Sequence, residues 1–251
     1  SVNSINWARI MAQVVYYFSA IQQVAANGES ISDGVSFSVP TGNFGNVLSG
    51  WIAKRMGAPI RNLVVGSNSN DILTRFFETH EMRARDVVPT LSPSMDIQVS
   101  SNFERLLFEM NGRDGGLTTE QLKRFRTAGA FAVESDQYDK WLAPVFRAAR
   151  CDDVQTTAMI KDVFESTGMM IDPHTAVGVL GGRSFQEDGV PMVTLATAHA
   201  AKFPDAVERA TGQRPGLPVH MADLFDRAER ITPVANDLAT VEAEVAALSG
   251  L

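Results

Sequence analysis

A short run of glycine and amide residues, Thr41 to Asn46, has the composition of an anion-binding loop. It lies between residues 35–39, whose alternation predicts a strand, and residues 47–55, which have a helical pattern. Glycine lets backbone N–H groups approach a ligand closely, and a helix start favours negative charge. The run therefore predicts a phosphate cradle. It matches neither a P-loop nor G-x-G-x-x-G, and a plain strand-to-helix turn explains the same residues about equally well.

Amide and hydroxyl groups also gather with an arginine near the beginning of the sequence. Asn3, Ser4 and Arg9 stand at the start of a helical pattern over residues 5–26. Such a set suits a phosphate or a carboxylate, because hydrogen bonds that involve a charged group are the strong ones. Helix capping by Ser4 beside a surface arginine is the simpler interpretation of these residues taken alone.

A third candidate follows a predicted strand at residues 191–197. Residues at the carboxyl end of a parallel strand face the ligand crevice of an open α/β sheet. The Thr197 hydroxyl could there bond a ring nitrogen. His199 is a candidate proton donor or a half-buried histidine with its hydrogen bonds satisfied, and for a lone histidine the satisfied core residue is commoner.

The remaining reactive side chains predict no further site. His80, His174 and His220 lack metal-ligand spacing with one another or with carboxylates, so no metal site is expected. The single cysteine, Cys151, has no histidine that the sequence places near it, and we expect a buried thiol.

Strand–loop–helix units in series predict an α/β fold with a parallel sheet flanked by helices. A further strand is expected at 62–65, and Asp172-Pro173 marks the start of a helix. The patterns also predict a capped helix ending at Phe77, capping boxes at Ser101/Glu104 and Thr118/Gln121, a helix around Trp141, Val145 and Phe146, a helix at 201–211, and a terminal helix containing Val234 to Leu248 with Pro233 near its start.

Composition narrows the classes of partner. The 251 residues carry 22 basic and 29 acidic side chains, a net charge of -7. Nothing in that balance resembles the basic surface of a nucleic-acid binder, and no apolar run is long enough to span a bilayer. We therefore expect no nucleic-acid or membrane partner. One cysteine in the whole chain fits a cytoplasmic protein.

Taken together, the motifs resemble one family, threonine synthase, an enzyme of fold type II (tryptophan synthase β-like) that uses pyridoxal 5'-phosphate. Five separated strings carry the resemblance in order. They are Asn3-Ser4-Ile5-Asn6 with Arg9, Pro40 to Asn46, Ser92 to Ile97 with Ser101 to Arg105, Asp172 to Ala176, and Thr197-Ala198-His199 with Ala201 to Phe203.

The resemblance implies roles for the candidate residues. Gly42, Asn43, Phe44, Gly45 and Asn46 would hold the cofactor phosphate, and Thr197 would bond the pyridine nitrogen. Asn3, Ser4 and Arg9, with Asn43 nearby, would bind the phosphate of the substrate. The family reaction converts O-phospho-L-homoserine and water into L-threonine and phosphate by γ-elimination and β-hydration.

One family feature is absent from these 251 residues. The Schiff-base lysine of the family lies in a Phe-Lys-Asp context upstream of the substrate-binding helix, and none of Lys54, Lys123, Lys140, Lys161 and Lys202 has that context. The chain is therefore expected to be the C-terminal portion of a threonine synthase, incomplete for lack of an N-terminal segment, with no catalytic lysine of its own. It would be inactive alone, would bind the cofactor weakly or not at all, and would have the missing segment as its partner.

The same resemblance predicts a domain division. Most of residues 1–251 would belong to the large, cofactor-binding domain. Part of the small domain would lie at 1–60, and extra helices at 101–170.

Other functions stay open at this point. A threonine dehydratase has the same fold type but no substrate phosphate for Asn3, Ser4 and Arg9 to bind. A non-catalytic module that binds a phosphorylated metabolite would explain the absent lysine. A scaffold without a ligand would leave the glycine loop no role beyond a turn.

Overall fold

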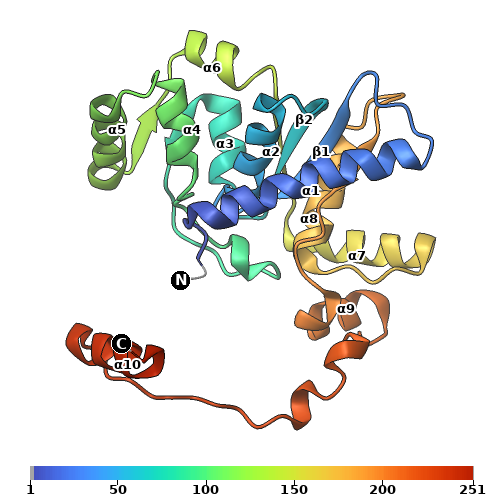
Figure 1. Ribbon diagram of the computed structural model, residues 1–251. Helices are drawn as coiled ribbons and strands as arrows, with labels where there is room; N and C mark the ends of the chain where they lie inside the picture. Colours follow the sequence, from blue (N-terminus) through green and yellow to red (C-terminus); the bar gives the residue numbers. More distant parts are fainter. Residues whose placement is uncertain (1–2, 251) are drawn as a thin grey trace. The chain divides into compact units, whose positions relative to one another are not determined.

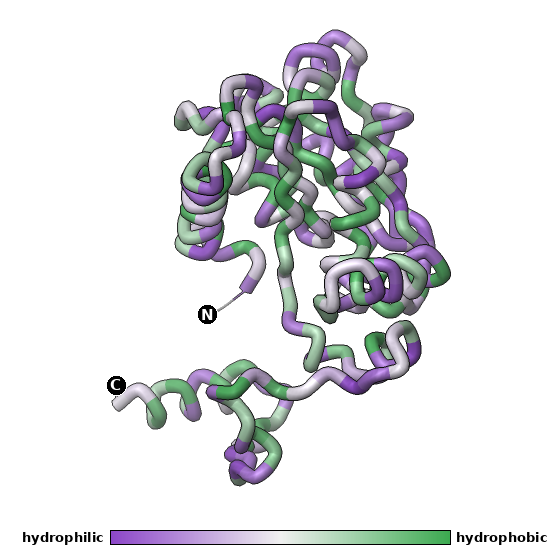
Figure 2. Tube along the Cα trace, turned by 90° about the vertical axis from the view of Figure 1, so that its right-hand side faces the viewer, coloured by the Kyte–Doolittle hydropathy of each residue, from purple (hydrophilic) through white to green (hydrophobic). Residues whose placement is uncertain are grey.

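The computed structural model describes residues 3–250 (Figure 1). Its contacts divide the chain into two compact units, with the boundary between Pro215 and Gly216. The first unit holds the sheet, most of the helices and all of the buried core. Figure 2 shows hydrophobic segments running through the inside of this unit.

Four parallel strands form the central sheet, in the order β5-β2-β1-β6. Every residue of β1 is buried, and all but one residue of β2, as expected for strands covered on both faces. The predicted parallel sheet is confirmed. The strands are β1 (Val35–Pro40), β2 (Ile60–Ser67), β5 (Phe146–Arg150) and β6 (Met192–Thr194).

Helices cover both faces of this sheet, and neighbouring residues of β2 show which helix covers which face. Leu63 approaches Gly50 of α2 (Gly45–Arg55), whereas Val64 approaches Gly181 of α8 (Pro173–Ser184). Outside α2 lies α1, and outside α8 lies α7, so the unit is built in layers (Figure 1). The other helices that complete these layers are α1 (Trp7–Ala26), α3 (Ile72–Thr79), α7 (Asp153–Thr167) and α9 (Pro204–Thr211).

A smaller set of elements fills residues 81–141. An antiparallel pair of short strands lies beside three helices and a single 3-10 turn. These elements are β3 (Glu81–Arg83), η1 (Pro93–Met95), α4 (Phe103–Met110), α5 (Gly115–Ala128), β4 (Ala130–Ala132) and α6 (Ser135–Trp141).

Three local predictions in this middle region were wrong. Trp141 ends α6, and Phe146 begins the edge strand β5, where its ring is 2 % exposed in the core. Neither expected capping box forms: α4 has no side-chain cap, and Asp114 starts α5 earlier by accepting the Leu117 N–H at 3.0 Å. Tertiary burial and a nearer carboxylate override the local patterns.

The second unit, residues 216–251, is described by itself. It contains η3 (Val219–Met221), η4 (Leu224–Asp226) and α10 (Leu238–Ser249), and none of its residues up to 250 is buried. Asp237 caps α10 by accepting the Thr240 N–H at 2.9 Å, so the predicted terminal helix begins after Pro233 rather than beside it. No helix within residues 3–250 is long and apolar enough to cross a membrane. The predicted division with a small-domain part at 1–60 and extra helices at 101–170 stays a prediction.

Candidate anion-binding site

A cavity of about 760 Å³ opens where β1 and β6 end. That volume is in the range of small-molecule sites. The three sequence motifs with chemical potential meet there, although they are separated by up to about 190 residues in the chain. The cavity is lined by Ser4, Arg9, Ala12, Gln13, Tyr16, Pro40 to Val47, Ser94, Met95, His174, Leu195 to Ala198 and Lys202.

The loop between β1 and α2 is shaped by close backbone contact. A Cβ atom at Gly42 would lie 2.8 Å from the carbonyl oxygen of Ser94, so only glycine fits without displacing that neighbour. Thr41 fixes the strand end, because its hydroxyl donates to Val39 O at 2.6 Å and its N–H donates to Gly66 O at 2.8 Å. These contacts leave the backbone that leads into α2 little conformational freedom.

Phe44 completes the turn in a left-handed conformation, with φ of 61°. Its side chain is buried and packs against Phe103 and Phe146, with ring centroids 5.3 and 5.9 Å away. This aromatic anchor stabilises a backbone conformation that a non-glycine residue rarely adopts. α2 follows at once, so the loop residues and the first turn of the helix share one wall of the cavity.

The first turn of α2 contains backbone N–H donors that are not used within the helix. Leu48 is the first residue whose N–H finds a helical acceptor, Phe44 O at 2.9 Å. Within residues 3–250, the N–H groups of Gly45, Asn46 and Val47 have no acceptor, and no side chain caps the helix. Unpaired N–H groups at a helix start, together with the helix dipole, form an anion site.

The facing wall is one side of α1. Arg9 forms no ion pair with any carboxylate in the described chain, and Gln13 lies one turn further along. The Gln13 Oε1 atom is buried and has no hydrogen-bond partner among residues 3–250. Arg9 and Lys202 line the cavity while no described carboxylate does, so the electrostatic potential there favours an anion.

Thr197 and His199 have different positions. Thr197 lines the cavity just after β6, and its hydroxyl forms no hydrogen bond within the described residues. The Nδ1 atom of His199 instead accepts the Ala201 N–H at 3.1 Å and caps η2 (Ala200–Lys202). His199 is exposed rather than the core histidine expected from the sequence, and Thr197 remains the site candidate on this strand.

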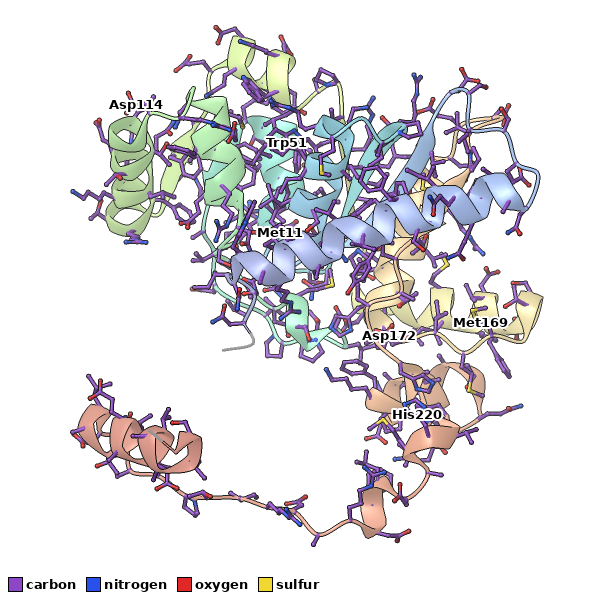
Figure 3. All side chains as sticks on the ribbon, viewed as in Figure 1. Met11, Trp51, Asp114, Met169, Asp172 and His220 are labelled. Carbon is purple, nitrogen blue, oxygen red and sulfur yellow. The ribbon has the colours of Figure 1, made fainter. Side chains whose placement is uncertain are left out.

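A buried carboxylate–imidazole pair supports the wall opposite Gly42. Asp172, labelled in Figure 3 where α8 begins, accepts from His174 Nδ1 at 2.9 Å, and His174 Nε2 accepts the Ser94 N–H at 3.3 Å. Burial pushes the pKa of Asp172 upward, but hydrogen bonds from His174 and Thr175 outweigh burial and hold the pKa below its ordinary value. The pair thus fixes the backbone of Ser94 against Gly42.

Comparisons with known proteins decide the family. A family model described as threonine synthase, C-terminal, matches residues 175–245. Threonine synthase of Pseudomonas aeruginosa is 50% identical over 98% of this chain and 52% of its own length. The chain belongs to the threonine synthase family.

Solved threonine synthases share the fold as well as the sequence. The PLP-bound threonine synthase from Brucella melitensis superposes with a TM-score of 0.89 at 47% identity, over 97% of this chain and 52% of its own. The yeast threonine synthase gives a TM-score of 0.87 at 34% identity, over 99% and 54%. The predicted fold type II is confirmed. The chain spans about half the length of the curated threonine synthases it matches.

Most of the predicted site residues lie around this cavity. Ser4, Arg9, Thr197 and residues 42–46 line it. Asn3 lies outside the lining, with its Oδ1 atom accepting the Ile5 N–H at 3.1 Å. The ligands that these residues bind stay predictions.

Sequence reasoning missed several lining residues. Gln13 and Tyr16 follow Arg9 at helical spacing, four and seven residues on, and that spacing could have revealed them. His174 was considered as a metal ligand and as part of the string Asp172 to Ala176, but its contact with Ser94 depends on the fold. No group of three metal-binding side chains occurs within residues 3–250. Cys151 is buried, and burial raises its pKa to about 11, which suppresses the reactive thiolate.

Proposed function

We propose that this chain supplies the phosphate-binding half of a threonine synthase. The whole protein then converts O-phospho-L-homoserine and water into L-threonine and inorganic phosphate, with pyridoxal 5'-phosphate as the cofactor. The observation that supports this proposal most is the lining of the cavity. It contains a glycine loop at a helix start and an unpaired arginine, and no described carboxylate.

The residues present fit this cofactor. The backbone N–H groups of residues 42–46 are proposed to bind its phosphate, because α2 begins there without a cap and Gly42 leaves no room for a side chain. The unpaired hydroxyl of Thr197 is proposed to bond the ring nitrogen. A neutral hydroxyl leaves that nitrogen without a full positive charge. When bound, the cofactor supplies an electron sink for the carbanion formed after proton abstraction.

Ser4, Arg9 and Asn43, with Asn3 close by, are proposed to bind the phosphate of the substrate. The arginine supplies charge-assisted hydrogen bonds, and the amide and hydroxyl add neutral donors. Holding the phosphate fixes the direction in which the γ-substituent leaves, which lowers the entropic part of the barrier. A Cβ–H bond and the bond from Cγ to the phosphate oxygen break, and Cγ gains a proton in place of the one lost from Cβ. Water adds its hydroxyl at Cβ, and its remaining proton leaves with the phosphate.

The Schiff-base lysine is proposed to lie in another segment of the same polypeptide, which is therefore the macromolecular partner of these residues. The domain division predicted above, with part of the small domain at 1–60 and extra helices at 101–170, belongs to the same proposal. A cytoplasmic location fits a biosynthetic reaction of this kind.

The test is an assay of the polypeptide at its natural length beside the chain 1–251. With O-phospho-L-homoserine and the cofactor, the natural-length protein should release phosphate and threonine in equal amounts, whereas chain 1–251 should release neither. Ammonia release from threonine, without phosphate release, would identify a dehydratase instead. Binding of the cofactor phosphate with no turnover by the natural-length protein would favour a non-catalytic module, for which the absent lysine motif is the supporting observation.

A further inference from the structure

Six consecutive residues, 100–105, lie behind the cavity wall, bonded to the lining residues Gly42 and Ser4, and none of the six lines the cavity itself. Residues 101–105 carried part of the family resemblance in the sequence, but nothing in the proposed function uses them. Their hydrogen bonds nevertheless reach both the glycine loop and the start of the chain.

Asn102 is the centre of this arrangement. It is fully buried, and its backbone N–H donates to Asn43 O at 3.0 Å. Its side-chain Nδ2 donates to Asn43 O at 2.9 Å and to Ser4 O at 2.7 Å. One side chain therefore joins the loop after β1 to the segment before α1, two segments about forty residues apart in the sequence.

The two preceding serines bind the same loop. Ser100 Oγ donates to Gly42 O at 2.8 Å. Ser101 Oγ donates to the Asn43 Oδ1 atom at 3.2 Å, which fixes the rotation of that amide. With its oxygen occupied on this side, Asn43 has its NH₂ group available as a donor toward the cavity.

Arg105 and Phe103 fix the string itself. Arg105 Nε donates to Asn102 Oδ1 at 3.2 Å, and Arg105 Nη2 donates to Ile5 O at 2.9 Å. The guanidinium also lies over the ring of Trp7 at 5.6 Å. Phe103 is buried edge-on against Phe44 and Phe76, at 5.3 and 4.9 Å. Asn102 is therefore held on both sides and cannot follow a shift of the groups it binds.

We infer that Asn102 is a positioning residue that sets the separation of Ser4 and Asn43, and that Ser101 orients the Asn43 amide. Neither touches the ligand. The inference rests on the proposed function, in which Ser4, Arg9 and Asn43 bind the substrate phosphate while backbone N–H groups of the loop bind the cofactor. Losing the Asn102 side-chain donors should therefore weaken substrate binding more than cofactor binding.

The first test replaces Asn102 in the natural-length protein. Asn102→Leu keeps the approximate volume and removes both donors. The KM for O-phospho-L-homoserine should rise about tenfold or more, while kcat and the visible absorbance of the bound cofactor change little. Asn62→Leu is the matched control, because Asn62 is 3% exposed, also donates through its amide, to Glu187, and lies near the opposite end of β2. Its KM should stay at the wild-type value.

A second pair of variants keeps the inference testable if Asn102→Leu does not fold. Ser101→Ala removes the hydroxyl that holds Asn43, and KM should rise about threefold. Ser101→Thr retains a hydroxyl and should restore the wild-type KM. A purely structural role for Ser101 predicts equal KM values for both variants, and that result would overturn the inference.

The outcomes separate this inference from the proposed function. If the wild-type protein forms no threonine, the proposed function fails, and calorimetric titration with inorganic phosphate replaces the KM. Asn102→Leu should then bind phosphate about tenfold more weakly than Asn62→Leu. Equal KM or equal phosphate affinity in these two variants contradicts the positioning role, whichever activity the wild-type protein has.

Discussion

Two loops at the same edge of the sheet differ in how their polar groups are paired. Residues 41–44 follow β1 and lead into α2, and residues 68–71 follow the adjacent parallel strand β2 and lead into α3. Both are short, both contain asparagine, and both end at a helix start. Only the first lines the large cavity.

The polar groups of the loop after β2 are paired within the protein by hydrogen bonds and ion pairs. Asn68 and Asn70 donate their amides to Asp96 Oδ1 at 2.8 and 3.0 Å. At the start of α3, Asp71 pairs with Arg75 at 2.8 Å and with Arg150 at 3.5 Å. A carboxylate already lies at this helix start, so its dipole is compensated internally.

The loop after β1 lacks such internal partners at its helix start. Neither helix start has a side-chain cap, so the loops differ in charge: the carboxyl edge of a parallel sheet does not by itself predict an anion site, and the helix start must also be free of a carboxylate. The loop after β2 also supports the loop after β1. Asp96, which binds the loop after β2, accepts hydrogen bonds from Thr90 and so holds the turn that contains Ser94. The carbonyl oxygen of Ser94 lies against Gly42. The internally bonded loop thus supports the wall of the open one.

The largest effect is expected at Gly42. In Gly42→Ala the new Cβ would lie 2.8 Å from Ser94 O, so the loop must move away from its neighbour. We expect the affinity of the natural-length protein for pyridoxal 5'-phosphate to fall about 100-fold, or ~2.7 kcal/mol. Absorbance titration measures it. Gly115→Ala is the control, because a Cβ there meets nothing within 4 Å. Similar affinities in the two variants would show that the loop does not bind the cofactor.

A substitution of Arg9 tests whether the positive charge in the cavity binds the substrate phosphate. Arg9→Gln should weaken substrate binding by roughly 1.5–3 kcal/mol and raise the KM for O-phospho-L-homoserine about 10- to 150-fold, since it removes a charged donor. Cofactor affinity should stay within about threefold. Steady-state kinetics give the comparison with Arg113→Gln, whose arginine pairs with Glu109 on the surface. An unchanged KM in Arg9→Gln would remove Arg9 from the substrate site.

Asp172 tests the wall that faces Gly42. Because its folded pKa lies below the unfolded value, its contribution to stability is complete above the unfolded pKa of about 4. That contribution disappears as the pH falls through the folded pKa. Asp172→Asn should therefore lower the free energy of unfolding by about 2 kcal/mol at pH 7 and by less below pH 4. Urea unfolding across pH 3 to 7 measures both. A cost that does not depend on pH would contradict the assignment.

The smallest effect on binding is expected in the loop after β2. Asp71→Ala removes the carboxylate shared by Arg75 and Arg150, and should lower the free energy of unfolding by about 1 kcal/mol. The affinity for the cofactor should not change. Urea unfolding and absorbance titration are the two measurements. A loss of cofactor affinity comparable to that of Gly42→Ala would erase the contrast between the loops.

The sequence predicted the loop after β1 (residues 41–44) better than the loop after β2 (residues 68–71). Thr41 to Asn46 could be read directly, because glycine spacing between a strand and a helix reflects local backbone requirements. The network around Asp96 joins residues far apart in sequence, and no local pattern encodes it. The helix predicted to end at Phe77 forms as α3, but the expected cap was wrong, because α3 has no side-chain cap.

Other parts of the site depended on tertiary structure. Phe146 lies in a strand although its neighbours suggested a helix, because burial beside β2 outweighs local propensity. The link from Asp172 through His174 to Ser94 spans about eighty residues. The string Ser101 to Arg105 was recognised as a motif, but its contacts with Ser4 and Asn43 appear only in the fold.

The most direct test of the central claim is a crystal structure of the natural-length protein with pyridoxal 5'-phosphate. We expect the phosphate to lie against the N–H groups of residues 42–46, and the ring nitrogen to lie within hydrogen-bond distance of Thr197 Oγ1. A cofactor phosphate bound at residues 68–71, or anywhere away from Gly42, would contradict the account.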